Sequence, residues 1–166
     1  MTYSVMSSVV SDQQATPVAK VNPIKKGGKK RATYGYATIV ATTVGQTNAL
    51  VRVPGRARID TFRAVNASMG NGALNFDIYR TDGTAVTSAG ALLALLPLTA
   101  HTLNSGVDMG ATAANAASDL NTLFATQIGT AGSTGDIEYD IVGVVATVST
   151  GTAVAFGLQV DYVLPE

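Results

Sequence analysis

Apolar and polar residues alternate along several short stretches of the chain, and turn signals separate these stretches. Residues 74–79 alternate strictly, with Leu, Phe and Ile at the even positions, which is the pattern of a strand that buries one face. The Asn-Gly pair at 71–72 and the Asp-Gly pair at 82–83 predict tight turns on either side. We therefore expect a half-buried strand here, with its even-numbered side chains in a core.

Two longer stretches near the C-terminus show a similar alternation. Odd positions from 139 to 147 include Tyr, Ile and Val, and even positions from 154 to 162 are all aliphatic or aromatic, so each stretch predicts a strand with one core face. Opposite the second core face stand Ala155, Gly157, Gln159 and Asp161. The residues between the two stretches, 149–151, predict a hairpin turn. Further strands are expected at residues 34–44, 49–53 and 57–65.

The middle of the chain is less regular. Residues 89–98 are apolar enough for a short helix or a buried strand, and Pro97 limits any helix. Residues 106–117 are small and polar, which predicts a surface loop, and residues 118–124 predict a single helical turn. Seven or eight short strands with little helix predict an all-β fold, an antiparallel sandwich or jelly roll, over residues 34–166.

Residues 1–33 lack this pattern. They contain Ser, Gln, Pro17, Pro23 and a run of Lys and Gly, with no apolar period that would build a core. We therefore expect an extended, basic N-terminal arm at 1–33, followed by the sandwich domain at 34–166.

Charge is distributed unevenly along the chain. The total is 11 basic and 11 acidic residues, but residues 1–63 carry ten Lys or Arg against two Asp, whereas residues 64–166 carry one Arg against nine acids. This asymmetry predicts that the N-terminal part contacts something acidic, either nucleic acid or an acidic protein surface such as a neighbouring copy. The plainer interpretation is that the basic N-terminal segment contacts no partner and is a solvated tail that its charge keeps soluble. The residues that we expect to contact a partner are Pro17, Pro23, Lys25, Lys26, Lys29, Lys30, Arg31, Arg56 and Arg58.

The sequence shows no recognisable set of catalytic residues. The chain has no Cys and a single His, His101, so it lacks the ligand set of a zinc site and shows no Gly-x-Ser-x-Gly nucleophile elbow. Asp136, Glu138 and Asp140 would share one face of a strand, where they could bind a hard cation or face a basic neighbour. We expect no enzymatic activity, cofactor, metal ion or small-molecule substrate. The most apolar run, 89–98, is half the length of a membrane-spanning helix, and the N-terminus lacks the basic region of a secretory signal.

Two segments carry a resemblance to a known family. Residues 51–63 (VRVPGRARIDTFR) and 74–83 (LNFDIYRTDG), together with the terminal Asp161-Tyr162-Val163, resemble the β-sandwich decoration or cement proteins of tailed-bacteriophage heads. The resemblance implies a homo-oligomer, with a trimer expected, at the capsid surface of the virion. There it would bind the major capsid protein and stabilise the shell.

Two other functions stay open from the residues alone. One is an adhesin-type binding module of a tail or cell surface, although the chain has no Trp and only six Tyr for sugar contacts. The other is a head protein that contacts DNA through the lysine run, although no aromatic residue lies within residues 20–31 for base stacking.

Overall fold

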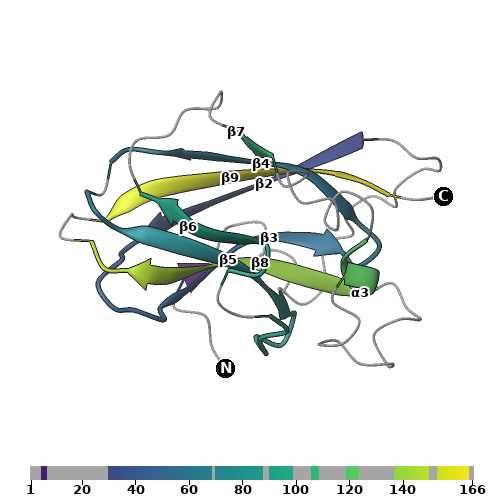
Figure 1. Ribbon diagram of the computed structural model, residues 1–166, viewed down its shortest axis with the longest axis horizontal. Coiled ribbons are helices and arrows are strands. Elements are labelled where there is room, and N and C mark those ends of the chain that lie inside the picture. The colour runs from purple at the N-terminus through teal and green to yellow at the C-terminus, as the bar shows by residue number, and fades with distance from the viewer. Residues whose placement is uncertain are drawn as a thin grey trace.

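Two β-sheets pack face to face and form the body of the protein (Figure 1). The sheets are antiparallel apart from one short parallel pair at an edge. The structure, a computed structural model, describes residues 5–6, 30–68, 70–87, 90–98, 106–108, 119–123, 137–149 and 153–164.

One layer is a sheet of five strands and the other a sheet of four. The first has the order β1 (Val5–Met6), β3 (Thr47–Pro54), β8 (Glu138–Thr147), β5 (Ala73–Arg80) and β6 (Leu93–Pro97). The second has the order β2 (Lys30–Ile39), β9 (Val154–Val163), β4 (Arg58–Asn66) and β7 (Gly106–Asp108).

The strand order is that of a jelly roll. Without the two-residue β1, each sheet has four strands, in the orders 3-8-5-6 and 2-9-4-7. All but one of the connections between consecutive strands from β2 to β9 cross from one sheet to the other, as a double-sheet jelly roll requires. The expected all-β sandwich or jelly roll is therefore confirmed.

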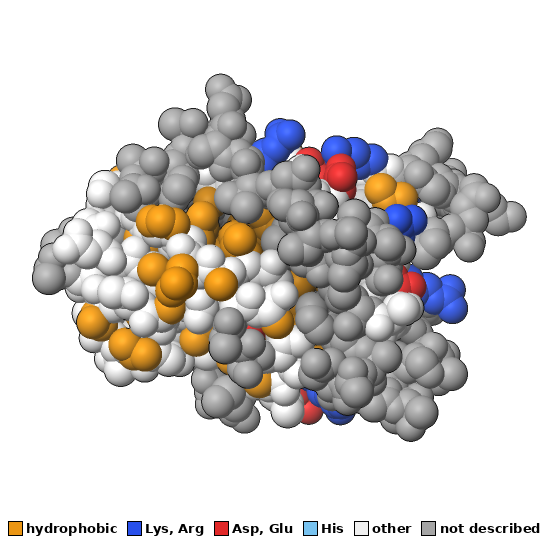
Figure 2. Space-filling model, in the orientation of Figure 1, with side chains coloured by type: hydrophobic (Ala, Val, Ile, Leu, Met, Phe, Trp, Pro, Cys, Tyr) orange, Lys and Arg blue, Asp and Glu red, His pale blue; other side chains and the backbone are white. Residues whose placement is uncertain are grey.

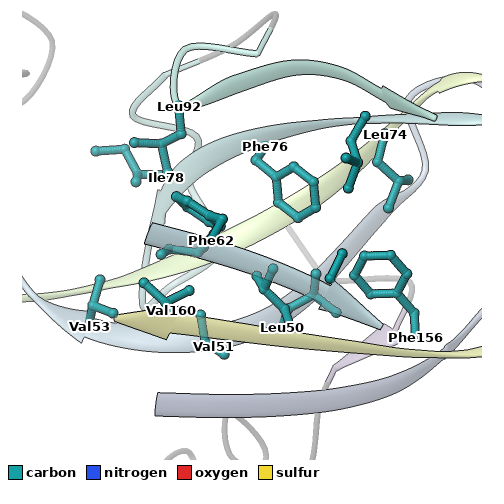
Figure 3. Close-up of a cluster of buried hydrophobic side chains, with 14 of the residues drawn as sticks. Leu50, Val51, Val53, Phe62, Leu74, Phe76, Ile78, Leu92, Phe156 and Val160 are labelled. Atoms are coloured by element: carbon teal, nitrogen blue, oxygen red, sulfur yellow. The ribbon is translucent and has the colours of Figure 1, made fainter. Parts of the chain in front are cut away.

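The core lies between the layers (Figure 3). Leu74, Phe76 and Ile78 of β5 are fully buried, as their alternation predicted. Phe76 stands between two other rings, with its centroid 5.8 Å from that of Phe62 on β4 and 6.4 Å from that of Phe156 on β9. Offset rings at these separations are the favoured geometry for aromatic pairs, so the three phenylalanines link three strands of both sheets.

A single helical turn, α3 (Leu120–Leu123), closes one end of the sandwich. Its Leu120 side chain is buried, and the Leu120 and Asn121 N–H groups donate to the carbonyls of Ala57 and Gly55. The Asp119 carboxylate accepts from the Thr122 N–H at 2.8 Å, the usual role of an N-cap residue. This confirms the helical turn expected at 118–124.

Some elements differ from those expected. β2 begins at Lys30 rather than Tyr34, because its register with β9 continues unbroken to Val163. Residues 93–97 form an edge strand and no helix, and 106–108, expected in a loop, pair with β4. The outer face of β5 was expected in solvent, yet Asp77 and Tyr79 are buried there. Of residues 1–29 the structure describes only β1, so the arm stays a prediction.

Candidate partner-binding surface

Charged side chains gather at one end of the sandwich. This charged end is where β2, β4 and β8 begin and where β3, β5 and β9 end: Lys30 and Arg58 both pair with Val163, and Glu138 pairs with Pro54. In Figure 2 the visible Lys, Arg, Asp and Glu side chains lie from the centre to the right of the view, toward the side of α3 in Figure 1, and none is seen on the left. The charged residues of this end are Lys30, Arg31, Arg56, Arg58, Asp60, Arg80, Asp82, Asp119 and Glu138.

The opposite end carries no charge among its described residues. Positions 39–49, 65–68, 70–75, 92–98, 143–149 and 153–157 contain neither Lys, Arg, Asp nor Glu. Two valines are exposed there, Val44 at 63% and Val148 at 43%. We call this part the uncharged end.

Four of the nine residues predicted to contact a partner meet at the charged end. Lys30 and Arg31 come from the start of β2, whereas Arg56 and Arg58 come from the turn between β3 and β4 and from the start of β4. Lys30 and Arg58 lie on either side of β9, about 10 Å apart by strand spacing. The other five predicted residues, Pro17, Pro23, Lys25, Lys26 and Lys29, lie outside the described residues.

Lys30 belongs to a small polar network on the outer face of the four-stranded sheet. Its Nζ lies 2.5 Å from Oδ2 of Asp60 and 4.0 Å from Oδ2 of Asp161. The hydrogen bond and the negative charge of Asp60 raise the pKa of Lys30 above its ordinary value. Asp161 is nearly buried and also accepts from Thr61 Oγ1 at 3.0 Å and from Gln159 Nε2 at 2.7 Å.

Among the acids of residues 64–166 whose side chains the structure describes, three are buried inside the fold. Asp140 receives two hydrogen bonds from Arg52, at 2.6 and 2.9 Å, on the outer face of the five-stranded sheet. Asp77 accepts the N–H groups of Gly90 and Ala91, and Asp161 lies in the network with Lys30. The negative charge of this half of the sequence is therefore partly neutralised within the chain itself.

The candidate cation site at 136, 138 and 140 is not formed by the described residues. Asp140 faces the guanidinium of Arg52 and is fully buried, Glu138 is exposed at the strand start, and Asp136 lies outside the described residues. The described residues contain no group of three His, Cys, Asp or Glu side chains close enough to hold a metal ion. Of the two interpretations given for this triplet, the basic neighbour is the one observed for Asp140.

Two tyrosines on β2, which are not among the nine residues predicted to contact a partner, extend the candidate surface. Tyr34 and Tyr36 are 48% and 59% exposed on the same face as Lys30. The Tyr36 ring lies over Gly157 of β9, where a Cβ added to the glycine would lie 2.6 Å from ring atom Cε1. Lys30, Tyr34 and Tyr36 are all even-numbered, so they share a face if they belong to one strand. The sequence contains this alternation, but it indicates a shared face only once β2 is known to begin at Lys30.

Two further sequence features concern this surface only indirectly. His101 lies outside the described residues. Within the described part of the chain, no helix has both the length and the apolar character needed to cross a membrane.

No protein-family model and no curated protein matches the chain. Among solved structures, the chain is similar to one described as the Cyanophage Pam1 capsid asymmetric unit, with 12% sequence identity and a TM-score of 0.43. That alignment covers 91% of this chain and 97% of the other. The strand order and the charge distribution together define an all-β jelly-roll domain with one charged end and one uncharged end.

Proposed function

We propose that the protein is a structural component of a phage virion that binds the outer surface of the capsid and stabilises it as a decoration or cement protein. The observation that carries the proposal is the charged end, where basic side chains from separate strands and turns meet at the point where the predicted arm joins the sandwich domain. The two segments that resemble head decoration proteins, 51–63 and 74–83, both run into this end.

The charge distribution favours an acidic partner outside the chain. Lys25, Lys26 and Lys29 precede Lys30 by five residues or fewer, and five extended residues span about 17 Å at most. In the proposed arrangement these lysines contact the same partner surface as the charged end. Because Asp77, Asp140 and Asp161 are buried, a neighbouring copy offers less acidic surface than its sequence implies, which favours acidic capsid surface as the contact.

The proposed stabilisation needs no strong single contact. One exposed ion pair contributes about 0–1 kcal/mol, but several on one domain and its arm combine through effective concentration. A protein that binds the assembled shell and not its separated subunits stabilises the shell by mass action. The same reasoning applies to a homo-oligomer, which presents several charged ends at once.

Quantitative mass spectrometry of purified virions, before and after mild guanidinium treatment, tests the proposal. We expect hundreds of copies per virion, and heads that lose integrity as this protein is released. A count of about a dozen or fewer would instead place the protein in the tail or at the portal vertex. Absence from the virion would contradict the proposal and favour the adhesin. The DNA-binding alternative would be favoured if the protein left the virion only together with DNA, at salt concentrations that screen contacts with phosphate.

A further inference from the structure

β2 is the longest and most regular edge among the described strands. The edges of the two sheets are β1, β6, β2 and β7. β1 and β7 have two and three residues, and β6 has five residues with an irregular register against β5. β2 has ten residues and pairs with β9 without a break.

The other long edge, β6, carries features that prevent further pairing. Leu95 has a positive φ of 54° and its N–H donates to Asn75 Oδ1, and Pro97 ends the strand. Bulges, prolines and short length are the usual protection of an edge strand. β2 contains no proline, bulge or acidic residue, and its two basic residues lie at one end. Along residues 32–39 β9 is the only described strand that pairs with β2, while β1 and β3 of the other sheet pack beside it. The other edge of β2 therefore has no paired strand among the described residues, and an unpaired edge is a template for another strand.

The solvent face of β2 offers anchors for such a strand. Tyr34 and Tyr36 stand two positions apart at the centre of the strand and are about half exposed. Because the Tyr36 ring already lies over Gly157, little freedom is lost when a second chain contacts it. Tyrosines held in this way are common energetic centres of protein interfaces.

We propose that β2 pairs antiparallel with β2 of a second copy of this chain, about a twofold axis at Gly35. Directly opposite residues of an antiparallel pair share a face, so Tyr34 of each copy would stand opposite the second copy's Tyr36. Arg31 would stand opposite Ile39, which separates the basic starts of the two strands by about 27 Å. A parallel pairing would bring these like charges together. The chain is thus complementary to itself only in the antiparallel arrangement.

The position of the axis follows from the same side chains. Axes at Tyr34 or at Gly35 both pair nine residues of each strand and keep outward side chains opposite outward ones. Only the axis at Gly35 places both tyrosines opposite tyrosines. The result is one continuous sheet built from the two four-stranded sheets.

This inference does not rest on the proposed function. It predicts a dimer in solution, whereas the resemblance to decoration proteins led to the expectation of a trimer. Sedimentation of the full wild-type chain separates the two, because the dimer has twice the 16.9 kDa mass of the chain.

Disulfide trapping tests the register directly, because the chain has no native cysteine. Full-length Tyr34→Cys and Tyr36→Cys are mixed and oxidised gently. In the proposed pairing the two sulfurs come from directly opposite residues, whose Cα atoms lie about 4.5–5.5 Å apart, within the range that a disulfide bridges. In either variant alone the two cysteines are two positions out of register and too far apart to bridge.

Thr38→Cys is the matched control, since Thr38 is exposed on the same face of the same strand and its copies would lie six positions out of register. We expect the mixture to cross-link at least tenfold faster than the Thr38→Cys control, and the wild type to sediment as a dimer. Cross-linking no faster than the control, with a monomer or trimer in sedimentation, would overturn the proposal. Fast linking of Tyr34→Cys alone would overturn the axis at Gly35.

Discussion

At the scale of single residues, Gly35 lies where β2 closely approaches the backbone of β3 in the facing sheet. A Cβ built on Gly35 would lie 1.7 Å from the carbonyl oxygen of Leu50 on the facing sheet, and backbone cannot yield as a flexible side chain does. Gly45 is a glycine for another reason, because its φ is +84° and the space around it is open. A side chain is therefore excluded at Gly35 by lack of space and disfavoured at Gly45 by the left-handed backbone conformation.

We expect Gly35→Ala to lower the free energy of unfolding by about 3 kcal/mol or more, since the layers must move apart. Gly45→Ala should cost about 1 kcal/mol, the penalty of a left-handed residue with a Cβ. Urea unfolding of both variants measures the difference. Equal losses would show that the sheets at Gly35 yield more easily than this packing implies.

The ion pair of Arg52 and Asp140 is buried on both sides, with side-chain exposures of 5% and 0%. Asp140→Ala removes the carboxylate and keeps the buried guanidinium, so we expect a loss of about 3–5 kcal/mol in the free energy of unfolding. The double variant Arg52→Met, Asp140→Leu removes both charges and should recover most of that loss. Chemical denaturation of the single and double variants completes the comparison, and a double variant no more stable than Asp140→Ala would contradict it.

At the scale of elements, Asp77 connects β5 to the segment that precedes β6. Its Oδ1 accepts the N–H groups of Gly90 and Ala91 at 3.1 and 2.9 Å, while the Ile78 N–H donates to Thr87. Asp77→Ala should therefore expose the Gly90 and Ala91 N–H groups to faster hydrogen exchange and cost about 1–3 kcal/mol. Asp77→Asn keeps one acceptor oxygen and should lose less. Unchanged exchange at both positions in Asp77→Ala would show that other contacts hold this segment.

Strict alternation made some elements and their faces predictable. β5 and β9 carry large apolar side chains at every second position, so their core faces followed from the sequence. β6 and β7 did not. The apolar run at 89–98 fits a short helix as well as a strand, and the small, polar residues at 106–117 fit a loop as well as an edge strand. Alternation also cannot tell whether the second face is covered, which is why the burial of Asp77, Tyr79 and Asp140 was missed.

The candidate surface was predictable by residue type and not by position. Runs of Lys and Arg marked Lys30, Arg31, Arg56 and Arg58 without structural knowledge. That they lie side by side depends on β9, which inserts between β2 and β4 from more than 90 residues further along the chain. Sequence patterns of local period carry no information about such a long-range register.

At the scale of the whole molecule, the stability should depend on pH in the alkaline range. Burial raises the pKa of Tyr79, Tyr139 and Tyr162 above the ordinary value near 10. Above about pH 10 the unfolded chain loses phenolic protons that the folded chain retains. The contribution of these tyrosines to the free energy of unfolding is therefore fully present below about pH 10 and is lost as pH rises through the raised pKa values. Urea unfolding from pH 8 to 11 measures this, and Tyr162→Phe should flatten the decline.

The charged end predicts how the proposed capsid binding responds to charge. Arg56→Gln with Arg58→Gln removes two positive charges there, and Thr42→Glu with Thr43→Glu changes the net charge equally at the uncharged end, where both threonines are exposed. Binding to purified heads should weaken about tenfold or more, and lose part of its salt dependence, only for the arginine variant. Equal weakening of both would show that net charge, and not its place, governs binding.

The uncharged end has a consequence for hydration. Ionised groups are the costliest to strip of water, and the described residues of that end have none to strip. A contact made there strips no ionised group of its water and changes little with salt, whereas a contact made at the charged end loosens as ionic strength rises. Contacts at the two ends should therefore respond to different additives. Added salt would release a contact at the charged end, and a mild detergent would release a contact at the uncharged end.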